Sequence, residues 1–395
     1  MKNRWKKVVS VLMVGTVIAG SMMGCGKSKD KGDGKGSDVK IAIICSSAGQ
    51  NDNGYNQSAV NGAKKAAEEF GVEYKVVEPT TGVPQALESL ADDGYNVIFN
   101  LEYDFEALIQ GTGGAQPIAE MYPDTTFVCV NDNPNQDESG KPIHDNVISV
   151  LFDVHQASFV AGALTTLVNE NAETLFGIEG YHFTPADKGG RSVGFIGGTN
   201  SNGITVFSYG YVEGINYEAE KLGVNYDYYA KYDAGFADSA TGSTVAGTYY
   251  NQGANVVFAV AGSVGDGVAS KAKEEGKLAI QVDANKDDQQ PGYILTSVIK
   301  NTEVPVYEIV KKAVEGKIEE MDQVQSYSLA SGAASITDLS EISKHVQESG
   351  KGKWEEIMAE LGDIEKKISD GTIQVTNAQN GEEFDPAKCP NVTMK

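Results

Sequence analysis

A flat ring and hydrogen-bonding side chains follow the first expected strand of the chain, residues 39–44. Asp52 offers two acceptor oxygens, Asn56 offers a donor and an acceptor, and Tyr55 offers a flat face. These groups could stack on a planar ligand and bind its polar edge. The alternative is that Asp52 or Asn53 only caps the helix that follows.

Two further pairs of polar residues stand where apolar segments end. Asn131 and Asp132 follow one segment, and the alternative there is a plain Asx turn. Asp283 and Lys300 end two later segments. A carboxylate that accepts and an ammonium that donates can hold vicinal hydroxyl groups, and the two charges balance each other in a partly dry cleft. The alternative is a structural ion pair across a hinge.

The second half of the chain offers glycine turns and one aromatic side chain. Gly197 and Gly198 precede a helical pattern, but the spacing of a dinucleotide or Walker motif is missing, which argues against a phosphate site. Phe207 either faces a ligand or belongs to the core. Gly262 lies in a small-residue turn whose backbone N–H groups could approach a ligand. This turn is also a variant of the nucleophile elbow, but the one downstream histidine, His345, lies in a polar stretch without the matching context.

Arginine, the usual grip on carboxylates and phosphates, is scarce. Outside residues 1–24 the chain has a single arginine, Arg191, and it precedes an apolar segment instead of following one. This arrangement favours a neutral, flat, hydroxyl-rich ligand.

The elements that must position these residues alternate along the chain. We expect strands at residues 39–44, 73–77, 96–100, 126–130, 146–152, 192–196, 225–231, 255–260, 278–282 and 293–299. We expect helices between most of them, including 55–70, 156–168, 206–222, 238–252, 264–275 and 304–315. Apolar strands that alternate with helices predict parallel sheets covered on both faces by right-handed βαβ units. The alternation occurs twice, so we expect an α/β fold of two doubly wound domains joined by a hinge, with the ligand at the carboxyl ends of the strands.

Length and charge agree with this organisation. The chain has 395 residues, of which 41% are hydrophobic and 22% charged, as in a globular protein of two domains. We expect residues 39–152 plus about 284–317 in the first domain, and residues 153–283 plus about 318–395 in the second. The net charge of -23 argues against a nucleic-acid partner, which needs a basic protein face.

The N-terminus has the organisation of a secretory signal. Residues 1–24 combine a basic stretch, an apolar run too short to span a membrane and a small-residue end. The Met-Met-Gly-Cys sequence that ends at Cys25 resembles a lipobox and predicts lipidation of this cysteine, the alternative being ordinary cleavage. Residues 25–38 are polar and glycine-rich, which predicts a flexible tether. We therefore expect an extracytoplasmic protein, lipid-anchored to a bacterial cell membrane.

The remaining cysteines do not suggest a metal centre. Cys45 and Cys129 lie in apolar segments and are expected to be buried, whereas a disulfide to Cys389 stays open. No CxxC motif occurs and no histidine is close to these cysteines in sequence, so we expect no metal and no cofactor.

Several segments, in order over about residues 39–317, resemble the basic membrane protein family of substrate-binding lipoproteins, which includes bacterial purine-nucleoside receptors. The matching segments are residues 51–56 (NDNGYN), 158–162 (SFVAG), 194–198 (GFIGG), 207–214, 253–258 (GANVVF), 261–262, 282–283 and 295–301 (LTSVIKN). Tyr55 replaces the usual Phe of the family, and Asn131 stands where Asp is frequent, so the base preference is open.

The resemblance implies a type I periplasmic-binding-protein fold and the capture of a nucleoside for an ABC importer, with permease and ATPase subunits as partners. The implied contacts are a base held between Tyr55 and Phe207, a base edge bound by Asp52, Asn56 and Asn131 or Asp132, and a ribose held by Asp283, Lys300 and the Gly262 backbone. Two other functions remain open. A ligand-sensing receptor for a sugar or riboflavin, docked on a transporter or sensor kinase, would have the same body. An enzyme of nucleoside metabolism is disfavoured, because the sequence offers no histidine base, metal cluster or phosphate grip.

Overall fold

A computed structural model describes residues 38–395 of the chain. The expected signal peptide (1–24), the lipidated Cys25 and the tether (25–38), apart from its last residue, lie outside the described residues. The described residues, 38–395, belong to one compact unit. Among the described residues, no helix has the length and apolar character needed to cross a membrane.

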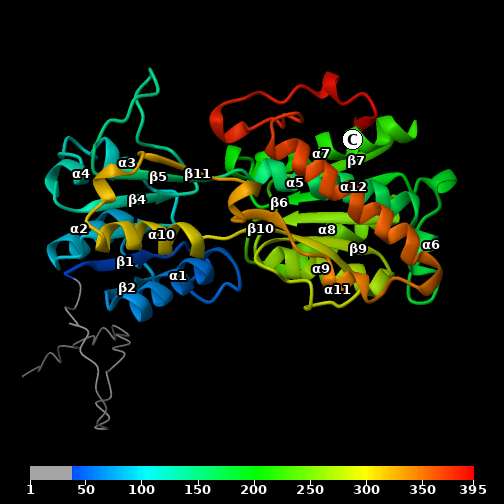
Figure 1. Cartoon of the computed structure of the whole chain (residues 1–395), viewed down its shortest axis with the longest axis horizontal. Coiled ribbons are helices and arrows are strands. Elements are labelled where there is room, and N and C mark those ends of the chain that lie inside the picture. Colours follow the sequence, from blue (N-terminus) through cyan, green and yellow to red (C-terminus); the bar gives the residue numbers. More distant parts are fainter. Residues whose placement is uncertain (1–37) are drawn as a thin grey trace, which may run out of the picture. The chain divides into compact units, whose positions relative to one another are not determined.

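The first sheet has six strands in the order β11-β5-β4-β3-β1-β2, and every neighbouring pair is parallel (Figure 1). Its strands are β1 (Lys40–Ile44), β2 (Glu73–Val77), β3 (Val97–Asn100), β4 (Thr126–Val130), β5 (Val147–Phe152) and β11 (Val324–Tyr327). Its helices are α1 (Tyr55–Phe70), α2 (Val83–Asp92), α3 (Glu106–Ile109), α4 (Ile118–Met121) and α10 (Glu303–Val314). Alternate residues of β1 enter different apolar cores: Ile41 and Ile43 pack on the α1 side, and Ala42 and Ile44 on the α2 side. We call these elements the first lobe.

The second sheet has seven strands in the order β12-β10-β9-β8-β6-β7-β13, and only β12 is antiparallel to its neighbour. Its strands are β6 (Ser192–Gly197), β7 (Tyr226–Lys231), β8 (Val256–Val260), β9 (Leu278–Asp283), β10 (Ile294–Lys300), β12 (Ala334–Ile336) and β13 (Val392–Met394). Its helices are α5 (Val154–Glu170), α6 (Ala172–Phe176), α7 (Asn202–Leu222), α8 (Ser239–Asn251), α9 (Ser263–Glu275), α11 (Ser340–Ser343) and α12 (Lys351–Ser369). We call these elements the second lobe.

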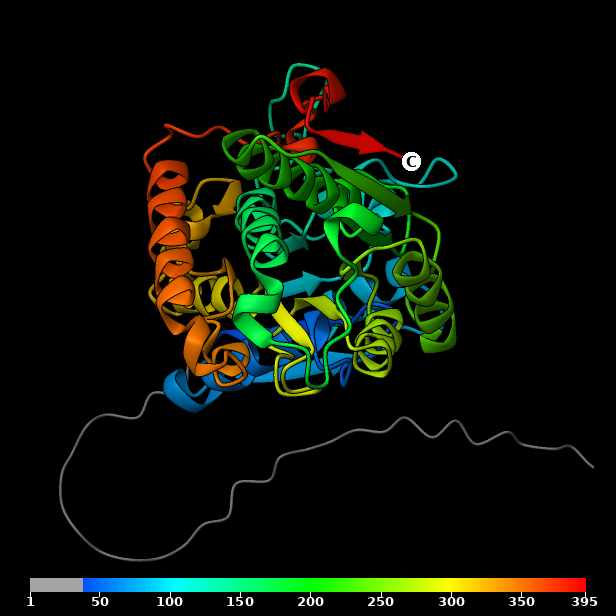
Figure 2. The same ribbon diagram turned by 90° about the vertical axis from the view of Figure 1, so that its right-hand side faces the viewer.

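Small residues allow α5 and α7 to pack closely. An added Cβ at Gly210 would overlap the carbonyl oxygen of His155, and one at Gly214 would overlap that of Phe159. Helix α12 in turn contacts α5 from outside, as Figure 2 shows. This packing fixes the start of α7, which carries Phe207.

The expected strands are present within one residue at each end, but two expected domain boundaries differ from the strand pairing. Strand β10 lies in the second sheet, beside β9, whereas residues 284–317 were expected in the first domain. Strand β11 lies in the first sheet, beside β5, whereas residues 318–395 were expected in the second. Helix α10, which packs on α1, follows the expected division, and so do β12, β13, α11 and α12 in the second lobe. An apolar strand pattern records burial but not which sheet buries it, and this explains both differences.

All three described cysteines, Cys45, Cys129 and Cys389, are buried and free. The disulfide to Cys389 that the sequence left open is therefore not formed in this structure.

Candidate functional site

An ion pair links the carboxyl ends of the neighbouring strands β9 and β10. Lys300 Nζ lies 3.2 Å from Asp283 Oδ1, and these side chains are only 8% and 16% exposed. Burial by itself lowers the pKa of Lys300, but Asp283, Tyr103 and Asp52 together outweigh that effect, so the net pKa is raised and the ammonium stays charged. Asp283 has a φ of +74°, a left-handed conformation that is uncommon for a residue with a Cβ.

The same ammonium faces two aromatic rings, one from each lobe. Lys300 Nζ lies 4.6 Å from the centroid of the Tyr55 ring and 5.7 Å from that of Phe207. The Phe207 ring is completely buried and packs edge-on against Phe258. The two rings expected to sandwich a base therefore both lie near the Lys300 ammonium.

Asp52 and Asn56 are engaged within the chain. The Asp52 carboxylate accepts hydrogen bonds from the backbone N–H groups of Gly54, Asn56 and Gln57, each at 3.0 Å. The completely buried Asn56 donates to this carboxylate and to Ser46 Oγ, and its Oδ1 accepts from Ser46 N. The geometry is the capping role that the sequence left as an alternative. Both residues fix the loop between β1 and α1.

Asn131 directly follows β4, at the carboxyl end of that strand in the first lobe. It has a φ of +70°, and its Nδ2 donates to the Tyr103 hydroxyl. The preceding carbonyl, that of Val130, accepts from the Tyr55 hydroxyl at 3.0 Å. Asp132 is exposed and its carboxylate accepts from the backbone N–H of the next residue, Asn133, at 2.8 Å, whereas an Asx turn would use the N–H two residues on. Of Asn131 and Asp132, it is Asn131 whose side chain hydrogen-bonds to an aromatic residue, Tyr103.

Gly262 helps to hold an exposed aromatic residue that the sequence analysis did not single out. Its φ is +53°, and an added Cβ would lie 2.8 Å from the carbonyl oxygen of Phe236. The same carbonyl accepts from Ser263 N, and the Phe236 ring covers Gly198, where an added Cβ would overlap it. Phe236 is 44% exposed at the carboxyl ends of the second sheet. Tyr103, 55% exposed after β3, is a similar case in the first lobe. The sequence could have indicated both aromatic residues as site candidates, because each of them follows an expected strand.

A cavity of about 570 Å³ opens beside the ion pair. It is lined by the start of α1, the loop after β9 and the end of β10: Asn53, Gly54, Gln57, Ser58, Asn61, Asp283, Ala284, Asn285, Lys286, Asp288, Gln289, Ile299 and Asn301. The lining is rich in amides and hydroxyls, which suit a ligand with hydroxyl groups. Of the site residues expected from the sequence, Asp283 lines this cavity.

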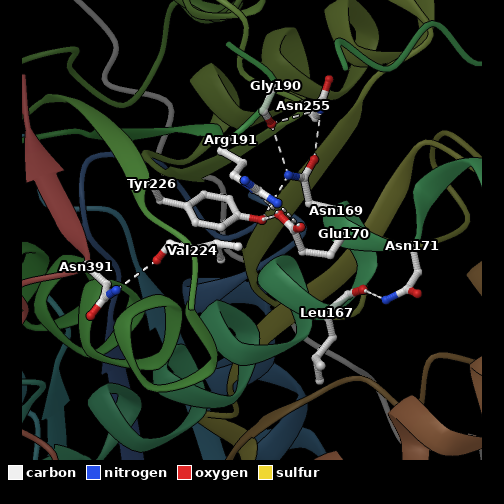
Figure 3. Close-up of polar contacts among 10 residues, drawn as sticks. All are labelled: Leu167, Asn169, Glu170, Asn171, Gly190, Arg191, Val224, Tyr226, Asn255 and Asn391. Carbon is white, nitrogen blue, oxygen red and sulfur yellow. Dashed lines mark hydrogen bonds and ion pairs between the residues drawn. The ribbon is translucent and has the colours of Figure 1, made fainter. Parts of the chain in front are cut away.

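Arg191 is engaged elsewhere, at the amino end of β6. Its Nε and Nη2 donate to the two carboxylate oxygens of Glu170 at 2.9 and 2.7 Å, and the Tyr226 hydroxyl donates to the same carboxylate, as Figure 3 shows. The site at the carboxyl ends thus contains no arginine among the described residues. No group of three or more His, Cys, Asp or Glu side chains in the described part of the chain could hold a metal ion.

The sequence and fold match known proteins. The family model described as Bmp, ABC transporter substrate-binding protein PnrA-like, matches residues 39–368. The chain is 28% identical over 357 residues to the ABC transporter nucleoside-binding protein BmpA of Lactococcus lactis subsp. cremoris, which covers 84% of this chain and 91% of that protein. It is 26% identical over 323 residues to an uncharacterized lipoprotein of Pyrococcus horikoshii, with 79% and 73% covered.

Among solved structures, an ABC transporter solute-binding protein from Aeropyrum pernix K1 has a TM-score of 0.69 and 22% identity, and the match covers 86% of this chain and 93% of that one. Together with the two parallel sheets, this likeness confirms the expected α/β type I periplasmic-binding-protein fold.

Proposed function

Because this chain belongs to the Bmp family of PnrA-like ABC transporter substrate-binding proteins, we propose that the ligand it captures is a purine nucleoside. A substrate-binding protein of an ABC transporter binds a small molecule and delivers it to the permease. The relative from Lactococcus lactis is named for nucleoside binding.

The observation that carries the proposal is the buried Asp283–Lys300 pair beside the Tyr55 and Phe207 rings. The carboxylate accepts and the ammonium donates, so together they match the vicinal hydroxyls of a ribose. The nearby rings match a flat base, and stacking on an aromatic side chain contributes about 1–3 kcal/mol per base. The position of Arg191, in its ion pair with Glu170, agrees with a ligand that carries neither phosphate nor carboxylate.

We further propose that Cys25 carries the lipid anchor and holds the protein on the outer face of the cell membrane. The relative from Pyrococcus horikoshii is named a lipoprotein, and the sequence before Cys25 has the lipobox pattern. Closure of the two lobes on the ligand would present it to the permease.

The test is calorimetric titration of residues 26–395, unfolded and refolded beforehand to remove copurified ligand. The titrants are guanosine, inosine, adenosine, uridine, riboflavin and ribose. We expect tight binding of a purine nucleoside and no binding of ribose alone. Binding of ribose without nucleoside binding would refute the base site, and binding of riboflavin alone would replace the nucleoside by a flavin. If none of the six binds, the nucleoside proposal fails.

A further inference from the structure

The chain continues for 27 residues beyond the family match, which ends at residue 368 of 395. This segment returns over the second lobe, where it is drawn in red in Figures 1 and 2. Thr376 donates through N and Oγ1 to the Glu213 carboxylate of α7, and Phe384 stacks on Tyr209 of the same helix with ring centroids 4.6 Å apart. Strand β13 then pairs with β7. We call residues 370–395 the C-terminal strap.

Between these anchors, the strap reaches across to the first lobe. Gln379 Nε2 donates to the backbone oxygen of Asn131 at 3.3 Å and lies 3.5 Å from its Oδ1. A Cβ built on Gly203, in the first turn of α7, would lie 3.6 Å from Asn131 Nδ2 and 4.0 Å from Gln379 Nε2. The strap, the start of α7 and the loop after β4 therefore meet at Asn131, an expected base-edge residue.

The orientation of the Gln379 amide is set by its partner. A backbone carbonyl can only accept, so the nitrogen of the amide must face Asn131 and the oxygen must point away. That oxygen, Oε1, is buried and has no hydrogen-bond partner among the described residues. A buried acceptor without a donor costs free energy, which a ligand with an N–H group would recover.

We propose that Gln379 is a specificity-determining residue, whose Oε1 accepts a hydrogen bond from an N–H group on the edge of the bound base. The inference rests on the proposed nucleoside function and adds to it the chemistry of the edge that is selected. Lys300 and Asp283 bind one end of the ligand, and Tyr55 connects the two ends, because its ring faces Lys300 and its hydroxyl binds the residue before Asn131. Gln379 and Asn131 bind the other end.

The test compares inosine, whose six-membered ring carries an N–H donor, with purine riboside, whose ring edge carries none. Both are titrated calorimetrically into residues 26–395 of the wild type, Gln379→Met and Gln374→Met. Gln374 is an exposed glutamine of the same strap and serves as the matched control. We expect Gln379→Met to weaken inosine binding by at least about fivefold, the value of one neutral hydrogen bond, and purine riboside binding by less than about twofold. The control should change neither affinity.

A second variant, Gln379→Glu, keeps an acceptor oxygen but loses the donor to the Asn131 carbonyl, so it should bind both nucleosides more weakly and still prefer inosine. Equal losses for both nucleosides in Gln379→Met would overturn the inference, because the residue would then act only on folding or closure. Unchanged inosine affinity would overturn it as well. Failure of the wild type to bind any nucleoside would instead refute the proposed function, so the two failures are distinguishable.

Discussion

Lys300 Nζ lies 3.2 Å from Asp283 Oδ1 while it faces the Tyr55 ring at 4.6 Å, so one ammonium connects two strands of the second sheet with a helix of the first lobe. The Lys300 residue is 6% exposed. Removal of one partner of a buried pair leaves the other charge uncompensated and typically costs about 3–5 kcal/mol. Any test of Asp283 must therefore separate ligand binding from stability.

Asp283→Asn is expected to weaken nucleoside binding by tenfold or more, about 1.4 kcal/mol. Asparagine tolerates the left-handed backbone of this position and keeps an acceptor, but it lacks the charge that pairs with Lys300. The double variant Asp283→Asn, Lys300→Met should recover stability but not affinity. Calorimetry and urea unfolding measure the two quantities. Wild-type affinity in a folded Asp283→Asn protein would refute the ribose assignment.

Phe236→Ala is expected to lower nucleoside affinity by about tenfold with little effect on stability. The ring is 44% exposed, so its removal takes little from the core. We predict that this ring, at the carboxyl ends of the second sheet, adds a further aromatic contact to the bound base, and loss of such a contact costs about 1–3 kcal/mol. Ile178→Ala, at a side chain that is 79% exposed, is the matched control. Equal affinities of the two variants would show that Phe236 does not contact the ligand.

Because of Lys277, the free energy of unfolding should increase as the pH rises above 8. Burial lowers the pKa of Lys277 to about 8, against the opposing effect of Glu275, and its Nζ donates to Thr184 Oγ1 and Asn255 Oδ1 at 2.8 Å. The unfolded chain, with an ordinary lysine pKa, binds more protons between about pH 8 and 10.5. Below the folded-state pKa, burial of the charged ammonium lowers the free energy of unfolding by its full amount. Across this window the free energy of unfolding therefore rises, by about 3 kcal/mol in all.

The measurement is the free energy of unfolding at a series of pH values for wild type and Lys277→Met. The variant should lack the wild-type rise, and the difference between the two curves removes the contribution of other groups. In Lys277→Met, the Asn255 Oδ1 keeps the backbone N–H of Thr184 as a donor at 2.7 Å. Parallel curves would contradict the prediction.

The three described cysteines should resist alkylation in the native protein. Burial raises the pKa of Cys45 to about 12, with added effects of Glu78 and Asp52, and burial raises that of Cys129 further. Burial, with Glu213 and Asp385 adding to it, also raises the pKa of Cys389 to about 12. The thiolate is the nucleophile, so little of it is present at pH 8. Iodoacetamide followed by mass spectrometry should label none of the three natively and all three in guanidinium. Fast native labelling of one thiol would show that its surroundings open.

The sequence by itself determined the strands and where their chemistry lies. Runs such as residues 39–44 and 278–282 record burial on both faces of a sheet, which is a local property of neighbouring residues. The rule that ligands bind at the carboxyl ends of parallel strands then selected Asp283 and Lys300, and the pairing of β9 with β10 does bring them together. The family resemblance supplied the proposed roles of the aromatic residues.

Only the tertiary structure decided which contacts these residues make. It placed β10 in the second sheet and β11 in the first. It showed that Asp52 and Asn56 form hydrogen bonds at the start of α1, and that Phe236 is exposed at the carboxyl ends of the second sheet. It also brought Gln379 to Asn131 across 248 residues of sequence. Hydrophobic periodicity carries no information about such partners, because a strand or loop shows the same pattern whichever neighbour buries it. Those partners are set by the packing of segments distant in sequence, and the site exists only where that packing brings them together.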